Sequence, residues 1–170
     1  MVLVYLSIGS NLGFRYSNIN NAIVGIKKLA SVVAVSSIYK TDPFGFAAQP
    51  YFLNLVCSIN TDRDPLQLLA RIKTLESYMG RVPIFQNGPR IIDIDILTYG
   101  DQLVDFPQLQ IPHPRIQDRN FVLTPLKEID PNFLHPSLNL TVSSLLDRLH
   151  DLSGVVKISD TIQINLKESD

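Results

Sequence analysis

The segment GPRIIDIDIL, residues 88–97, sets two aspartates into a run of isoleucines that is typical of a β-strand. Side chains alternate along a strand, so the isoleucines at alternate positions share one face while Asp93 and Asp95 share the other. Aspartate is disfavoured in strands and costly to bury. The segment therefore predicts a strand over residues 91–99 with one face in a core and an acidic opposite face.

The acidic pair has two interpretations. Residues two apart on a strand have Cα atoms roughly 6.5–7 Å apart, which at an effective dielectric of about 20 means roughly 2.4 kcal/mol of repulsion between Asp93 and Asp95. A cation between them reverses the sign, and carboxylate oxygens suit Mg²⁺. No histidine or cysteine lies beside the pair, which disfavours zinc. The alternative is a solvated acidic face at a sheet edge, and the aspartates alone favour that alternative.

Two arginines shift the balance towards a phosphate site. Arg90 leads directly into the predicted strand, and Arg81 begins the loop before it. Guanidinium groups opposite paired carboxylates are what the handling of a polyphosphate requires. The sequence has neither a P-loop nor the protein-kinase motifs. The segment Gly9-Ser10-Asn11 resembles a phosphate-binding nest only weakly, and a turn is favoured there.

The order of predicted elements is β-α-β-β-α-β, the order of a ferredoxin-like α+β sandwich. Strands are predicted over residues 2–8, 32–39, 52–61 and 91–99. Apolar spacing predicts one helix capped by Ser17 or Asn18, and a second that runs from the cap Asp64 to Gly80. This order gives one antiparallel sheet with both helices on one face and the other face free for ligands. After Gly100 the sequence predicts short proline-punctuated pieces, a helix near residues 141–150 and two short alternating stretches.

Length and composition predict a single folded domain over residues 1–170. The net charge of −1 provides no general attraction for nucleic acid or anionic membranes, so we expect neither as a partner. No apolar run reaches the length of about 20 residues that a membrane span needs, and the N-terminal sequence lacks a signal-peptide pattern. The single cysteine, Cys57, lies in an apolar stretch and predicts a buried, inert thiol in a cytoplasmic protein.

Seven ordered motifs resemble one family. They are IGSNL (8–12), YKTDPFG (39–45), QPYFLN (49–54), ESYMGR (76–81), GPRIIDIDIL (88–97), IPHPRI (111–116) and RNFVLTPLKEI (119–129). In this order they resemble the 6-hydroxymethyl-7,8-dihydropterin pyrophosphokinase family over about residues 8–131, which leaves residues 132–170 as a C-terminal extension. The resemblance implies a ferredoxin-like enzyme of folate biosynthesis, which we expect to be a monomer. Its reaction transfers pyrophosphate from ATP to the pterin hydroxymethyl group and gives AMP and the dihydropterin diphosphate.

The resemblance also implies roles for individual residues. Asp93 and Asp95 match the pair that holds two Mg²⁺ ions on the ATP phosphates, and with Arg81 and Arg90 they form the catalytic set. The positions matching ATP contacts are Glu76, Arg81, Arg90, Ile96, His113 and Arg119. The positions matching pterin contacts are Thr41, Asp42, Phe44, Phe52, Asn54 and Phe121. A flat bicyclic ring needs aromatic faces, and its amide-like edge needs paired donors and acceptors such as those of Asn54.

The sequence departs from the family pattern in the loop before the acidic strand. Asn87 stands where many relatives carry an aromatic residue, and Pro83 stands where some carry a second arginine; Phe85 is a candidate substitute lid. His135 and His150 are predicted at the surface or in the tail, without a role. The last 20 or so residues predict an extra hairpin or a partner edge. The alternative functions are a non-catalytic pterin- or nucleotide-binding module and a different metal-dependent phosphotransferase or hydrolase.

Overall fold

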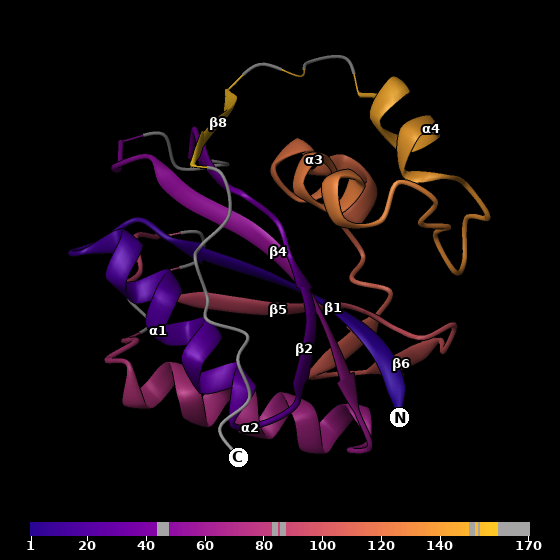
Figure 1. The fold of residues 1–170 in the computed structure, drawn as a ribbon, viewed down its shortest axis with the longest axis horizontal. Helices are drawn as coiled ribbons and strands as arrows, with labels where there is room; N and C mark the ends of the chain where they lie inside the picture. The colour runs from indigo at the N-terminus through magenta and orange to yellow at the C-terminus, as the bar shows by residue number, and fades with distance from the viewer. Residues whose placement is uncertain (44–47, 83–84, 86–87, 150–151, 153, 160–170) are drawn as a thin grey trace.

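The computed structural model describes residues 1–43, 48–82, 85, 88–149, 152 and 154–159 (Figure 1). Its main sheet is antiparallel throughout and has the order β5-β1-β4-β3-β8, with β2 also paired to β4. The strands of this sheet are β1 (Val2–Ser10), β2 (Ser31–Val35), β3 (Ile38–Thr41), β4 (Phe52–Thr61), β5 (Asp93–Tyr99) and β8 (Val155–Ser159). Strands β6 (Val104–Phe106) and β7 (Leu109–Ile111) form a separate two-stranded sheet. The helices are α1 (Arg15–Lys27), α2 (Pro65–Tyr78), α3 (Asn120–Ile129) and α4 (Val142–Asp147), with a 3₁₀ turn at Ile116–Asp118.

Local sequence signals predict β4 and α2 correctly. Strand β4 has the predicted bounds, and the Asp64 side chain accepts a hydrogen bond from the Gln67 backbone N–H at 2.9 Å, as expected for the cap of α2. Gly80, just past the end of this helix, has a φ of +85°, which favours glycine. These elements need no tertiary information because each boundary is marked by its own residues.

The predicted start of α1 is wrong. The helix begins at Arg15 after Phe14, without a side-chain cap. Asn18, one of the two predicted caps, instead donates from Nδ2 to the Leu12 carbonyl at 2.9 Å and to Ser10 Oγ at 3.1 Å. Its amide therefore ties the first turn of the helix to the end of β1.

The single strand predicted over residues 32–39 is divided into β2 and β3, which both pair with β4. Ser36 lies at the break. Its hydroxyl donates to the Ser37 carbonyl at 2.8 Å and accepts from the Val56 backbone N–H at 3.0 Å. A side chain that binds backbone groups in this way competes with the regular ladder, and this explains the division.

The sheet is covered on both faces, so the prediction of one free face is wrong for part of the sheet. Helices α1 and α2 cover one face, and α3 and α4 lie on the other (Figure 1). There Tyr5, Val56 and Leu97 pack against apolar residues of α3. The sequence did not predict α3, because Pro125 lies inside it and proline usually ends a helix. The mixed α/β class with an antiparallel sheet is confirmed, and the exact ferredoxin-like topology stays a prediction.

The burial of Cys57 and of His135 tests two further predictions. Cys57 is fully buried as predicted, and burial raises the pKa of its thiol to about 12. The prediction of a surface His135 is wrong, since the residue is 3% exposed.

Part of the C-terminal extension, as β8, joins the sheet beside β3. Residues 160–170, Phe44, Pro83, Asn87 and His150 lie outside the described residues. Along the described chain, no helix combines the length and the apolar character that crossing a membrane requires.

Candidate active site

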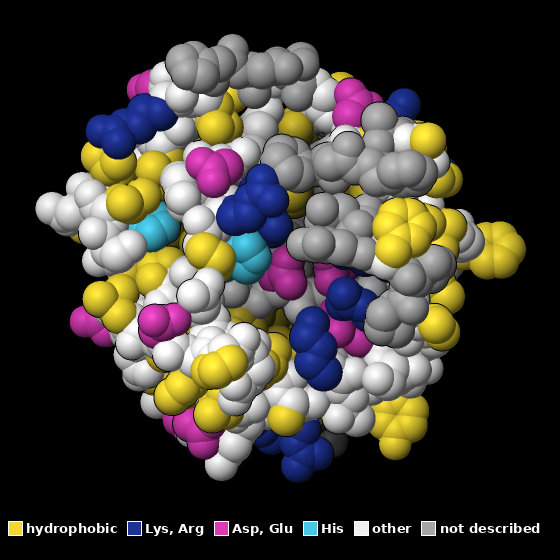
Figure 2. All heavy atoms as spheres, turned by 180° about the vertical axis from the view of Figure 1, so that it is seen from behind, with side chains coloured by type: hydrophobic (Ala, Val, Ile, Leu, Met, Phe, Trp, Pro, Cys, Tyr) yellow, Lys and Arg dark blue, Asp and Glu magenta, His cyan; other side chains and the backbone are white. Residues whose placement is uncertain are grey.

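A cavity of about 260 Å³ lies on the sheet face that α3 covers in part. We call it the main cavity. The register of the strands brings the residues at the base of this cavity together. Ser7 lies opposite Asp95, and Gly9 lies opposite both Asp93 and Asn54. The residues that line it are Ser7, Gly9, Thr41, Asp42, Phe52, Asn54, Arg81, Arg90, Asp93, Asp95, His113, Arg119 and Phe121. Figure 2, which views the molecule from behind Figure 1, shows basic, acidic and histidine side chains gathered near its centre.

The structure brings together nearly all of the residues predicted for the site. Of the predicted residues that the structure describes, Glu76 and Ile96 do not line the main cavity. Phe44 lies outside the described residues. Glu76 is buried on α2, and its Oε1 accepts from the Ile94 backbone N–H on β5 at 2.7 Å. Ile96 lines a neighbouring cavity of about 300 Å³, which shares Asp95 and His113 with the main cavity. We call this second space the side cavity.

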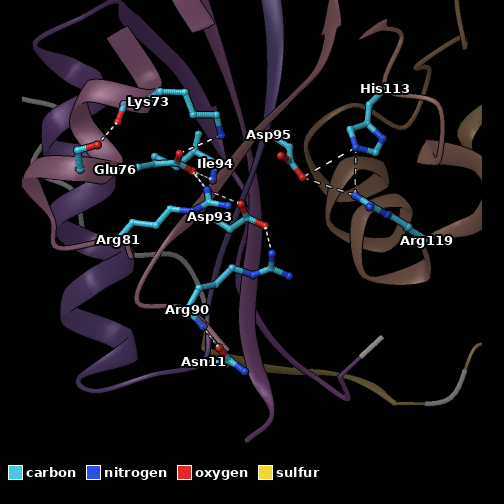
Figure 3. Close-up of polar contacts among 11 residues, drawn as sticks. Asn11, Lys73, Glu76, Arg81, Arg90, Asp93, Ile94, Asp95, His113 and Arg119 are labelled. Carbon is cyan, nitrogen blue, oxygen red and sulfur yellow. Dashed lines mark hydrogen bonds and ion pairs between the residues drawn. The ribbon is translucent and has the colours of Figure 1, made fainter. Parts of the chain in front are cut away.

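Asp93 is held by two arginines. Arg81 Nη1 lies 2.6 Å from its Oδ1 and Arg90 Nη1 lies 3.2 Å from its Oδ2. Arg81 also pairs with Glu76, whose Oε2 lies 2.9 Å from Lys73 Nζ (Figure 3). Burial disfavours the charged form of Arg81, but the carboxylates of Asp93 and Glu76 outweigh burial and raise the pKa of Arg81 above its usual value. In this state the acidic and basic groups neutralise one another.

Asp95 is less well compensated than its neighbour. His113 Nε2 lies 4.0 Å and Arg119 Nη1 lies 3.6 Å from its Oδ2, beyond hydrogen-bond distance (Figure 3). Burial raises the pKa of the Asp95 carboxyl, and the negative charge of Asp93 raises it further. The nearby cations oppose this shift without cancelling it. Burial also lowers the pKa of His113 and of Arg119. This corner of the main cavity therefore favours an additional cation next to Asp95.

The donor set fits a divalent cation bound together with a polyanion. In the part of the chain that the structure describes, no cluster of three or more His, Cys, Asp or Glu side chains is arranged to hold a metal. Asp93 and Asp95 can thus supply only part of an oxygen coordination shell, and phosphate oxygens and water can complete one. The Nε atoms of Arg90 and Arg119 are buried without a hydrogen-bond partner among the described residues. Such unpaired donors are costly, and a phosphate oxygen can satisfy them.

Another part of the main cavity has aromatic and amide character. Phe52 and Phe121 both line it, and each ring has a guanidinium over it, with Arg90 Cζ 5.4 Å and Arg119 Cζ 5.6 Å from the respective centroids. Asn54 lies nearby, and its Nδ2 donates to Thr41 Oγ1 at 2.6 Å. Groups for a polyanion and groups for a flat polar ring therefore share one cavity.

Sequence reasoning missed the role of Asn11. Its Oδ1 accepts from the Arg90 backbone N–H at 2.7 Å, and its own backbone N–H donates to the Arg90 carbonyl at 3.1 Å (Figure 3). Its Nδ2 donates to Gln49 Oε1 at 3.0 Å and to the Pro50 carbonyl at 3.1 Å. Asn11 therefore joins two loops at the rim of the cavity. The sequence indicated only a turn at Gly9-Ser10-Asn11 and gave no role to the Asn11 side chain, because its partners lie far along the chain.

Lys73 and Phe85 illustrate two other outcomes. Lys73, which the motifs did not single out, lines the side cavity and pairs with Glu76. Phe85 is 52% exposed and is not among the described residues that line the main cavity. The proposal that Phe85 closes over a substrate stays a prediction.

The fold and the main cavity define an α/β protein that can bind a polyanion and a cation beside a flat polar ring. The chain belongs to the 7,8-dihydro-6-hydroxymethylpterin-pyrophosphokinase (HPPK) family, whose model matches residues 5–131. This membership confirms the family that the sequence motifs resemble. The match ends before the C-terminal extension begins.

Individual relatives fall into two groups. The chain is 42% identical over 136 residues to a 2-amino-4-hydroxy-6-hydroxymethyldihydropteridine pyrophosphokinase of Aquifex aeolicus, covering 80% of this chain and 85% of that protein. It is 43% identical over 143 residues to the folic acid synthesis protein FOL1 of Dictyostelium discoideum, covering 84% of this chain. The chain spans about a fifth of the length of that protein and of two fungal proteins similarly named, with 22%, 21% and 20% covered.

Solved structures support the fold. The wild-type HPPK-DHPS of Plasmodium falciparum with pteroate superposes with a TM-score of 0.70 at 19% sequence identity, covering 86% of this chain and 42% of that one. At this identity the likeness concerns the fold alone. It agrees with the mixed α/β arrangement described above.

Proposed function

We propose that this chain transfers pyrophosphate from ATP to the hydroxymethyl oxygen of 6-hydroxymethyl-7,8-dihydropterin, giving AMP and the dihydropterin diphosphate in folate biosynthesis. The observation that carries the proposal is one cavity in which Asp93, Asp95 and arginines adjoin two phenylalanines and a buried asparagine carboxamide. Family membership supports it, because relatives of comparable length carry the corresponding name. We further propose that the chain works as a cytoplasmic monomer on these small molecules alone.

In this proposal the phosphates of ATP lie among the cations of the main cavity. Arg81 and Arg90 exchange their contacts with Asp93 for phosphate oxygens, and Arg119 and His113 bind from the opposite side. The exchange costs little because a guanidinium binds a phosphate with the same fork geometry as a carboxylate. It also frees the oxygens of Asp93 for a cation.

Asp93 and Asp95 are the residues proposed to hold two Mg²⁺ ions. When bound, Mg²⁺ supplies Lewis-acid polarisation of phosphate oxygens and neutralises charge that develops on them. Burial and the charge of Asp93 both disfavour the charged form of Asp95 and raise its pKa, and a bound cation would offset both effects. No further protein ligands are needed to complete the coordination of Mg²⁺, since phosphate and water oxygens suit this ion.

The side cavity is the proposed place for the adenosine of ATP. It adjoins the main cavity through Asp95 and His113, and Leu69, Ile96 and Leu109 give it apolar walls. A purine ring binds well against aliphatic side chains with polar groups at its edge. Gln108, Gln110 and Lys73 provide the polar groups, and Glu76 contributes by holding Lys73 and Arg81 in place.

The pterin is proposed to bind at the aromatic and amide part of the main cavity. Phe52 and Phe121 supply faces for the ring, and Asn54 with the Thr41–Asp42 backbone supplies partners for its polar edge. In the reaction a bond forms between the hydroxymethyl oxygen and the β-phosphorus while the bond from the β-phosphorus to the α,β-bridging oxygen breaks. The bridging oxygen leaves with AMP, and the hydroxyl proton is released. The residues of the cavity act by holding the reactants in line and by stabilising charge.

Incubation of the protein with ATP, Mg²⁺ and 6-hydroxymethyl-7,8-dihydropterin tests the proposal. AMP and the pterin diphosphate should form together, and neither should form when the pterin is omitted. Pterin binding without turnover would instead support a non-catalytic binding module. ATP consumption without pterin would support a different phosphotransferase or hydrolase.

A further inference from the structure

Asn54 is enclosed on both sides by neighbouring strands. It is 5% exposed, and on central strand β4 it lies opposite Gly9 of β1 on one side and next to β3 on the other. Its Nδ2 donates to Thr41 Oγ1 at 2.6 Å, across the β3 side. The carboxamide therefore spans the gap between the two flanking strands.

On the β1 side the carboxamide uses the space that a side chain at position 9 would need. A methyl group at Gly9 would lie 2.4 Å from Asn54 Oδ1 and 3.6 Å from its Cγ. Real Cβ atoms do not approach another heavy atom as closely as the first of these distances. Asn54 can keep this position only because residue 9 is glycine.

This enclosure sets which polar groups Asn54 can offer. One amide hydrogen is used by Thr41, so the second amide hydrogen and the Oδ1 lone pairs are available to a ligand. The Thr41 hydroxyl accepts this bond and keeps its own hydrogen for donation. Thr41 is itself fixed between strands, with Phe52 opposite it on β4 and Val155 on β8. The result is a donor and an acceptor held at fixed positions in the main cavity.

We propose that Gly9 and Thr41 are positioning residues that fix the Asn54 carboxamide for recognition of the pterin's amide-like edge. Gly9 leaves the space for the carboxamide, and Thr41 holds its nitrogen. This inference rests on the proposed function, because it concerns the pterin part of the same cavity. It assigns substrate discrimination to the way in which Gly9 and Thr41 hold Asn54: an edge lacking the matching acceptor and donor leaves buried polar groups unpaired.

Three variants test the proposal. Thr41→Val removes the hydroxyl with little change of shape, Thr41→Ser retains it, and Gly9→Ala fills the space used by Asn54. We expect Thr41→Val to raise the KM for the pterin about 3- to 10-fold and to leave the KM for ATP unchanged, as for the loss of one hydrogen bond. Thr41→Ser should restore the pterin KM to within about twofold of wild type. Gly9→Ala should weaken the pterin at least as much as Thr41→Val does.

Thr61→Val is the matched control. Thr61 is a buried threonine at the opposite end of β4, and its Oγ1 accepts from the Arg63 backbone N–H at 3.2 Å. Its substitution removes a comparable hydroxyl from the same sheet and should leave the pterin KM unchanged. Binding of 6-hydroxymethylpterin, followed by its fluorescence, provides a readout that does not depend on turnover.

The outcomes separate the inference from the proposed function. A wild-type protein that turns over the pterin, with a Thr41→Val variant of unchanged pterin affinity, overturns the inference alone. Equal weakening of pterin and ATP by Thr41→Val assigns Thr41 a merely structural role and also overturns it. A wild-type protein that neither binds nor turns over the pterin overturns both. If Thr41→Val fails to fold, Gly9→Ala decides the matter, because it disturbs Asn54 from the other side with Thr41 intact.

Discussion

Asp95 combines an acidic side chain with surroundings that disfavour its charge. Its side chain is 32% exposed, yet the cations nearest to it lie beyond hydrogen-bond distance and the charge of Asp93 opposes it. A carboxylate in such a place is a cost to the folded protein unless a cation binds. The negative charge of Asp95 therefore serves the proposed cation binding but lowers the stability of the protein when no cation is bound.

We expect Asp95→Asn to lower kcat for pyrophosphate transfer by at least about 100-fold, the scale seen when electrostatic stabilisation of a transition state is removed. The same change should leave the unfolding temperature equal or higher, because an amide has no charge to desolvate. AMP formation and thermal unfolding measure the two effects. Asp105→Asn on the exposed strand β6 is the control and should change neither. Near-normal turnover of Asp95→Asn would contradict the metal assignment.

Asn11 shows how one side chain can position another. Its side chain accepts from the Arg90 backbone N–H and donates to the loop at Gln49 and Pro50, while its backbone N–H donates to the Arg90 carbonyl. We expect Asn11→Ala to cost about 1–3 kcal/mol of unfolding free energy, because buried polar partners lose their bonds. It should also raise the KM for ATP, since the Arg90 backbone N–H loses its acceptor and only the backbone bonds to the Arg90 carbonyl remain.

Urea unfolding and steady-state kinetics measure the effects of Asn11→Ala. Asn11→Asp is the matched variant, because it keeps the oxygen that accepts from the Arg90 backbone N–H and loses only the amide donor. It should therefore retain more of the affinity for ATP than Asn11→Ala does. An ATP KM unchanged in both variants would show that Arg90 does not need the side-chain contact with Asn11.

At the residue scale, the sequence predicted those positions whose chemistry is visible within a short segment. Asp93 and Asp95 are set on one face by strand alternation, and the structure places both in the main cavity. Asn11 and Lys73 could not be predicted in this way, because their importance comes from contacts that form only when distant segments meet. Burial of His135 escaped prediction for the same reason.

At the element scale, β8 connects the C-terminal extension to the main cavity. The Gly154 carbonyl, just before β8, accepts from the Asp42 backbone N–H at 3.1 Å. Gly154 has a φ of +72°, and a methyl group there would lie 2.8 Å from Asp42 Oδ2. The extension thus holds the end of β3 at the cavity, although it lies outside the family match.

Gly154→Ala should lower the unfolding free energy by about 1–2 kcal/mol, the cost of a left-handed backbone for a residue with a Cβ. It should also raise the pterin KM, because the Asp42 carboxylate must move. Urea unfolding and kinetics test both effects. Gly13→Ala is the control that separates backbone strain from the contact with Asp42. Gly13 also has a positive φ, of +62°, but an added methyl there has no atom within 4 Å. Equal kinetic effects of the two variants would contradict the role assigned to β8.

Helices and strands differ in how well the local sequence predicts them. Helix α2 and strand β4 carry their own boundary residues, so their predicted and observed limits agree. The break between β2 and β3 depends on Ser36 bonding to a strand that is distant in sequence. Helix α3 contains Pro125 and is stabilised by its packing on the sheet, which outweighs the local preference against it.

At the scale of the whole molecule, the two-layer sandwich predicted from the order of elements becomes three layers. The added layer, α3 and α4, lies on the second sheet face (Figure 1). It leaves room on this face for the main cavity, which Phe121 of α3 lines together with residues of the sheet. Element order alone predicts a free face but gives no measure of how much of it a later segment covers. The position of the cavity therefore follows from where the helical cover ends.

The stability of this third layer should depend on pH through His135. The residue is buried, and its Nδ1 accepts from the backbone N–H groups of Leu138 and Ser137 at 3.3 and 3.4 Å. Burial lowers the pKa of His135 below its usual value of about 6.5. Between the lowered pKa and about 6.5 the unfolded chain binds more protons than the folded protein. The free energy of unfolding must therefore fall as the pH falls below about 6.5.

His135→Asn provides the comparison, because the Oδ1 of asparagine can accept from the same N–H groups and has no proton to bind. We expect the wild type to lose unfolding free energy relative to His135→Asn as the pH falls from 7 to 5, and the difference to stay constant above pH 7. Urea unfolding at each pH measures it. The lowered pKa of His113 acts in both proteins and cancels in the difference. A wild type that gains stability relative to the variant at low pH would mean that the folded protein binds the proton at His135.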